Sequence, residues 1–218
     1  MEAVQSRNAV GSNWGAAEAK PANSRSFDAT RMGQMSCMIK DVIIHAKHSG
    51  EQMADRNSTH SLLRERIVEH VFVGDVLRLL WRRGVTDVEV LRSEFDSHGY
   101  DLVMARGHMV RHLQLKTGTS RRPTDVSVSL ALATKPSGCV LWIHVNDNLD
   151  MGPFFWFGDG PGQALPSIET LKIPKRATHN KAGIRPERPN HRLVPPNRFT
   201  RLETLDEVLN KLFGEFPS

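Results

Sequence analysis

Two short apolar runs around a glycine turn constrain the fold more than any other feature of the chain. Residues 100–105 (YDLVMA) have the composition of a buried strand, and Arg106-Gly107-His108 fits a tight hairpin turn. Residues 109–116 then predict the returning strand. The segment that begins at Gly99 and ends at Lys116 is therefore expected to form a β-hairpin.

Side chains alternate along the returning strand, which sorts its residues between two faces. Gln114 and Lys116 share one face, roughly 6.6 Å apart along the strand. Leu113 and Leu115 take the other face, and we expect them to pack into the core and fix the register. In a simple hairpin register, Asp101 at the start of the first strand comes within reach of Gln114 and Lys116.

A long run with helical spacing precedes the hairpin. Apolar residues recur between Leu62 and Trp81 at the spacing of one long, largely buried helix of about six turns. Ser58 or Thr59 is expected to cap its start, and Gly84 to end it.

Two carboxylates of this helix are candidates for chemistry. Glu65 and Glu69 lie one turn apart and share a mostly apolar face, where a carboxylate is more informative than on a polar face. Glu69, at the centre of that face, is the preferred candidate. The alternative is that both side chains pair with neighbours on a solvated stripe.

The remaining segments indicate a single α/β or α+β domain. Residues 1–58, rich in Ser, Asn, Ala and Gly, predict a disordered extension or an over-long gene start. Residues 59–171 would form the core, and residues 172–218 a basic, Pro-rich loop and a closing helix. The other expected elements are a strand at 87–91, an ambiguous strand or helix at 126–133, strands at 139–145 and 154–157, and a helix opened by the capping box at 204–207.

Positive charge is concentrated between residues 172 and 201, in a chain whose net charge is +5. Five prolines exclude a continuous helix there, and a loop of this length is usually functional or disordered. The functional interpretation is contact with the phosphates of a nucleic acid, without readout of its sequence. The alternative is a solvated, flexible tail. The candidate nucleic-acid-binding residues are Lys172, Lys175, Arg176, Lys181, Arg185, Arg188 and Arg192.

Other features of the sequence narrow the class of protein. No apolar stretch approaches the roughly 18 to 20 residues that span a bilayer, so no membrane partner is expected. Cys37 and Cys139 stand far apart, which predicts two free thiols in a reducing compartment. The cytoplasm is therefore the expected location.

The hairpin residues suit phosphodiester hydrolysis, because Mg²⁺ is held by hard oxygen ligands and usually keeps several waters. Asp101 would be the chief metal ligand, and the Gln114 side-chain oxygen and the Leu115 carbonyl could complete the coordination. Lys116 would position the attacking water and stabilise the transition-state charge. Glu69 would add a second carboxylate, and Mn²⁺ could replace Mg²⁺. As an alternative, Lys116 is only a solvated strand end.

The helix glutamate, Gly-Tyr-Asp101-Leu-Val and Gln114-Leu-Lys116 together resemble the PD-(D/E)XK nuclease superfamily, which includes restriction endonucleases, Holliday junction resolvases and Mrr-like enzymes. The resemblance covers roughly residues 60–145. It implies a restriction-endonuclease-like core, in which helices flank a mixed central sheet of about four strands. It also implies that the strand aspartate and the acidic residue two before the lysine bind Mg²⁺. Gln114 departs from the family's usual Glu or Asp, and Tyr100 from its usual Pro.

Three functions follow as expectations. The first is a Mg²⁺-dependent endonuclease that hydrolyses DNA, with Asp101, Gln114, Lys116 and Glu69 as catalytic residues. The second is a catalytically weak or inactive relative that only binds DNA, because Gln114 removes a negative ligand. The third is an interaction module of a defence or mobile-element system, with the basic segment on a partner protein or RNA. A homodimer is compatible with the first, because cutting both strands usually requires two sites.

Overall fold

The computed structural model describes residues 59–94 and 98–216. Contacts divide the chain into residues 1–50 and 51–218, and every described residue belongs to the second unit. The expectations for residues 1–58 and for Cys37 lie outside the described residues. Within the described part, no helix combines the length and the apolar character that crossing a bilayer requires.

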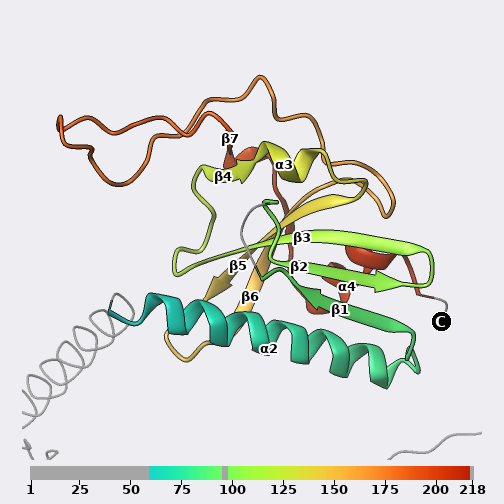
Figure 1. The fold of residues 1–218 in the computed structure, drawn as a ribbon. Coiled ribbons are helices and arrows are strands. Elements are labelled where there is room, and N and C mark those ends of the chain that lie inside the picture. The colour runs from blue at the N-terminus through green and yellow to red at the C-terminus, as the bar shows by residue number, and fades with distance from the viewer. Residues whose placement is uncertain (1–58, 95–97, 217–218) are drawn as a thin grey trace, which may run out of the picture. The chain divides into compact units, whose positions relative to one another are not determined.

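A mixed six-stranded sheet forms the centre of the described unit (Figure 1). Its order is β1-β2-β3-β5-β6-β8, and β3 pairs with β5 in parallel, whereas every other neighbouring pair is antiparallel. The mixed α/β class is therefore confirmed, with more strands than the four expected. The strands are β1 (Val88–Arg92), β2 (Leu102–Arg106), β3 (Met109–Gly118), β5 (Gly138–Val145), β6 (Met151–Phe157) and β8 (Thr200–Leu202).

The predicted hairpin is confirmed in detail. Arg106 pairs with Met109, so the loop between β2 and β3 holds only Gly107 and His108. Gly107 has a φ of 56°, which a two-residue hairpin loop requires at its first position when the turn is of type II′. Local sequence thus determines the register that positions the rest of β3.

The long predicted helix is α2 (Ser61–Arg82), but it is not largely buried. Only one face packs on the sheet, through residues that include Phe72, Val76 and Leu80. The opposite face is exposed, with Trp81 73% accessible. The predicted N-cap is wrong, since His60 is the N-cap residue and makes no side-chain cap hydrogen bond. The predicted end is confirmed, because the helix stops at Arg82 and Gly84 follows the C-cap residue with a φ of 71°. Apolar residues can recur at helical spacing on a face that no other element covers.

Two hydrophobic cores lie on opposite faces of the sheet. The first joins α2, the sheet and α4 (Leu205–Phe213), whose predicted capping box between Thr204 and Glu207 is confirmed. The second lies under β4 (Val126–Ser129), β7 (His191–Val194) and α3 (Leu130–Ala133) (Figure 1). The ambiguous segment at 126–133 is thus a strand followed by one helical turn, and β4 pairs with β7 in a separate two-stranded sheet.

A buried arginine of β3 forms hydrogen bonds with α4 and with the segment after β6. Arg111 on β3 has no solvent exposure, and its guanidinium donates to Ser137 Oγ and to the backbone carbonyls of Asp159, Gly160 and Lys211, at 2.8–2.9 Å. Burial lowers the pKa of Arg111. The hydrogen bonds of Nη1 and Nη2 help to offset the cost of burying this charge, although Nε has no partner among the described residues.

Candidate active site

The candidate site lies where β3 extends beyond its partner. The pairing of β2 with β3 ends at Leu102 and Leu113, whereas β3 continues to Gly118 beside β5. Among the described residues, no strand pairs with β3 from Gln114 onward on the side away from β5. An exposed strand edge offers backbone amides and carbonyls to other groups.

Asp101 occupies this edge. One oxygen of its carboxylate, Oδ2, accepts a hydrogen bond from the Leu115 amide at 2.7 Å. The Asp101 amide in turn donates to the Leu113 carbonyl at 2.9 Å. The amide and carbonyl of one strand residue point to the same side, so the Leu115 carbonyl also faces the side of Asp101. These contacts hold the carboxylate against the backbone of β3.

Gln114 follows Leu113, the last residue of β3 that pairs with β2, and the Asp101 amide donates to the Leu113 carbonyl. Asp101 and Gln114 are therefore close in the hairpin. Gln114 is 5% exposed, and its Oε1 has no hydrogen-bond partner among the described residues. A buried carbonyl oxygen without a donor is costly, so this atom is suited to a group that the protein alone does not supply.

A pocket of about 320 Å³ brings most of the predicted residues together. It lies between the first half of α2 and the end of β3. Glu65, Glu69, Asp101, Leu115 and Lys116 all contribute to its wall. Gln114 is not among its lining residues. Leu62, Arg66, Val68 and Thr117 complete the lining.

The two glutamates of α2 differ in their environment. Glu69 is buried, and its carboxylate lies 3.1 Å from Arg66 Nη1 and 3.4 Å from Arg92 Nε. Two guanidinium groups compete with any cation for this carboxylate. Glu65 is exposed and forms no ion pair with the described residues. The pocket geometry therefore favours Glu65 as the second acidic group. The sequence had favoured Glu69, because Glu69 lies at the centre of the apolar face of the helix.

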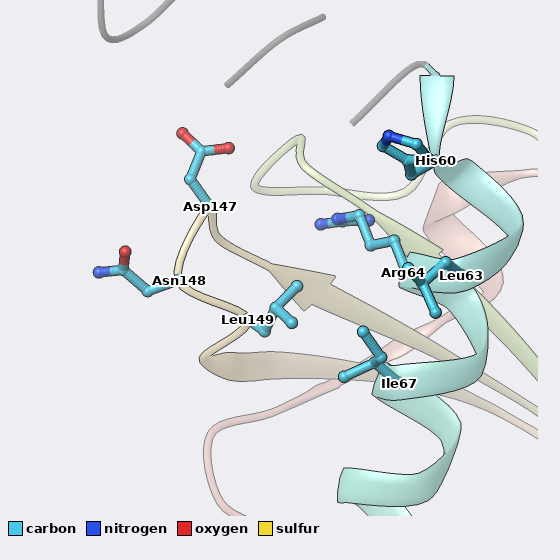
Figure 2. A pocket seen from close by; sticks show the side chains of 7 residues that line it. All are labelled: His60, Leu63, Arg64, Ile67, Asp147, Asn148 and Leu149. Atoms are coloured by element: carbon cyan, nitrogen blue, oxygen red, sulfur yellow. The ribbon is translucent and has the colours of Figure 1, made fainter. Parts of the chain in front are cut away.

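A second pocket lies at the start of α2, on the side of the β5–β6 turn (Figure 2). Leu63, Ile67 and Leu149 give it an apolar wall, and Arg64 Nη2 donates to the Val145 carbonyl at 2.9 Å. Figure 2 shows the Asp147 side chain pointing away from α2. No predicted catalytic residue lines this pocket, so we do not assign the chemistry to it.

The predicted nucleic-acid-binding residues divide into two groups. Arg192 donates to the carbonyls of Glu169, Pro189 and His191, and Arg188 Nη2 lies 2.7 Å from His191 Nε2. These two arginines therefore stabilise their own segment. The others are exposed, namely Lys172, Lys175, Arg176, Lys181 and Arg185.

Most of these exposed side chains belong to an extended arm, which we define as residues 174–188. In Figure 1 the arm projects from the region of β7 and extends to the left of the view. The first turn of α2 lies on that side of the view as well.

The oxygen groups at the edge of β3 could hold a divalent cation without a cluster of acidic side chains. Within residues 59–94 and 98–216, no three or more His, Cys, Asp or Glu side chains gather in a way that could hold a metal ion. Mg²⁺ does not require such a cluster, because one or two carboxylates suffice when waters fill the other positions. The Asp101 carboxylate and the unpaired Gln114 oxygen are both hard donors and therefore fit Mg²⁺ chemically.

Comparisons with known protein families and curated proteins found no relative of this chain. No protein-family model matches the chain, and no curated protein matches it in sequence.

Proposed function

We propose that this chain is a metal-dependent nuclease that hydrolyses phosphodiester bonds of DNA and has a restriction-endonuclease-like core. The observation that carries the proposal is the pocket at the open edge of β3, where Asp101, Lys116 and the α2 carboxylates meet. Acidic oxygens beside a lysine on a rigid strand are the groups that phosphodiester hydrolysis requires.

Each residue would have a distinct task. Asp101 and the Leu115 carbonyl would hold a Mg²⁺ or Mn²⁺ ion, with Gln114 beside them and Glu65 or Glu69 at the opposite wall. When bound, the cation would lower the pKa of a coordinated water and neutralise phosphate charge. Lys116 would orient the attacking water and stabilise negative charge on the phosphate.

A DNA-binding protein without cleavage activity is the second candidate. Two observations favour it: Gln114 supplies no negative charge, and Glu69 is already paired with Arg66 and Arg92. Both features weaken the attraction of the site for a cation.

Cleavage assays with two isosteric variants separate the candidates. Asp101→Asn keeps an oxygen that can accept from the Leu115 amide but removes the charge, and Lys116→Met keeps most of the apolar stem. We expect wild-type protein to cleave plasmid, single-stranded or branched DNA in Mg²⁺ or Mn²⁺ but not in EDTA. Asp101→Asn should abolish cleavage, and Lys116→Met should lower the rate by about 10²- to 10⁴-fold.

A remote carboxylate provides the control. Asp87 is exposed and pairs with Arg106 at the far end of the β1–β2 pair, so Asp87→Asn should cleave as wild type. Metal-independent DNA binding without cleavage by the wild type would favour the second candidate. Equal cleavage by wild type and Asp101→Asn would refute the assignment of the site.

A further inference from the structure

The arm (residues 174–188) is held together by its own backbone hydrogen bonds, although its prolines predict only a loop. Lys175 and Glu187 form an antiparallel bridge. The Arg176 amide donates to the Pro186 carbonyl at 2.7 Å, and the Arg188 amide to the Pro174 carbonyl at 2.8 Å. At about 3.3 Å per residue, the six steps from residue 174 to residue 180 extend roughly 20 Å. The arm is therefore long enough to reach well beyond the body of the domain.

The tip of the arm is a closed, internally bonded turn. The Asn180 amide donates to the Ile184 carbonyl at 2.8 Å. Asn180 Oδ1 accepts from the amides of Ala182 and Ile184, each at 3.0 Å. Gly183 supplies the positive φ of 72° that the turn needs. These hydrogen bonds close the tip on itself.

An apolar side chain stands at this tip among positive charges. Ile184 is 62% exposed, and Lys181 and Arg185 flank it in sequence. The arm carries five Lys and Arg residues against Glu187 alone. Ile184 is the only large exposed apolar side chain among residues 174–188. Minor-groove proteins combine cationic contacts to phosphates with an apolar wedge that enters a base step.

The base of the arm is anchored to the domain. The Leu193 amide of β7 donates to the Lys172 carbonyl at 2.8 Å, and Pro174 is buried. The Arg192 guanidinium joins β7 to the Glu169 carbonyl. These contacts attach the base of the arm to β7 and to the segment before it, so the arm starts from a fixed point on the domain.

We propose that the arm binds duplex DNA and that Ile184 inserts between neighbouring base pairs, which unstacks them and bends the duplex. The proposal rests on the proposed function in one respect, namely that DNA is the ligand. Lys175, Arg176, Lys181 and Arg185 contact phosphates on either side of the inserted side chain. Binding energy from these charges offsets the cost of unstacking, a few kcal/mol per base step.

A fluorescent base analogue tests the insertion directly. Full-length protein in EDTA is titrated into 30-bp duplexes that carry 2-aminopurine at successive positions, with affinity measured in parallel by fluorescence anisotropy. We expect wild-type protein to increase 2-aminopurine emission at one or two positions. Ile184→Ala should lose this increase and bind up to about tenfold more weakly, whereas Ile184→Met should retain it.

Two further variants separate the wedge from the charges. Trp81→Ala removes an exposed apolar side chain on α2 and should leave both signals unchanged. The Lys181→Ala/Arg185→Ala double variant should reduce the slope of log affinity against log salt by about 2. At about four phosphate contacts, wild-type affinity should fall roughly 150-fold between 50 and 200 mM salt.

The outcomes distinguish this proposal from the proposed function. Unchanged emission from the wild type on every duplex, or an unchanged signal from Ile184→Ala, overturns the insertion while leaving the nuclease assignment intact. If Asp101→Asn cleaves DNA as well as the wild type while the 2-aminopurine response is retained, the proposed active site is wrong and the arm proposal stands. If no duplex binds at all, the arm proposal is wrong, and the cleavage assay in Mg²⁺ decides the nuclease proposal separately.

Discussion

Replacing Gln114 with glutamate tests the adjacency on which the candidate site depends. Asp101 and Gln114 adjoin the last β2–β3 pair, Leu102 with Leu113, and if they continue the pairing their Cβ atoms lie about 4.5–5.5 Å apart. Two carboxylates at about 5 Å repel each other by roughly 3 kcal/mol at an effective dielectric constant of 20. Gln114 is 5% exposed, so desolvation adds to this cost. In EDTA at pH 8, Gln114→Glu should therefore lower the free energy of unfolding by about 3 kcal/mol.

A divalent cation should reverse this loss if the two side chains share a cation site. A ligand at 100 times its dissociation constant adds about 2.7 kcal/mol to the stability of the folded state. We therefore expect 10 mM Mg²⁺ to restore most of the stability of Gln114→Glu and to change that of the wild type less. Urea unfolding followed by tryptophan fluorescence, in EDTA and in Mg²⁺, measures both differences.

Two controls isolate the charge. Gln114→Met removes the unpaired amide without adding a charge and should stay close to wild type. Asp101→Asn/Gln114→Glu removes one of the two charges and should recover stability in EDTA. If Gln114→Glu equals wild type in EDTA and does not respond to Mg²⁺, residues 101 and 114 are not neighbours and the geometry of the site is wrong.

Three other predictions concern the strands around the site. Gly118→Ala should destabilise the fold by about 1–3 kcal/mol in thermal or urea unfolding, because its Cβ would lie 2.5 Å from Trp142 Cζ2; equal stability would contradict this contact. Burial raises the pKa of Cys139 to about 12, so in a Cys37→Ser background a thiol reagent at pH 8 should label only unfolded protein, and rapid native labelling would refute the burial. Burial also lowers the pKa of His112, so its contribution to stability is complete above about pH 6.5 and falls as the pH drops toward the folded-state pKa. His112→Gln should flatten stability against pH in that window, and an unchanged slope would exclude the effect.

The local parts of the fold could be predicted from the sequence, whereas the long-range parts could not. The β2–β3 hairpin and the α4 capping box depend on residues a few positions apart, and both form as predicted. The pairing of Val126 with Val194 joins segments far apart in the chain. No periodicity within either segment specifies the other as its partner.

The same division applies to the site. Asp101, Leu115 and Lys116 meet because one hairpin carries all three. Glu69 reaches the pocket as expected, but its partner Arg92 comes from β1, and helix spacing alone could not identify that ion pair. The exposed face of α2 was missed for a related reason, because apolar periodicity indicates which residues could be buried and not which neighbours exist to cover them.

The bonds of Arg111 have a consequence for synthesis of the chain. Its partners lie 26 to 100 residues further toward the C-terminus, and the last is the Lys211 carbonyl in α4. While the ribosome is still making β5 and β6, the guanidinium has no complete set of acceptors and cannot be buried without cost. Burial of the first core must therefore wait until α4 has left the exit tunnel. We expect the described unit to fold only once α4 is available, in a single cooperative step.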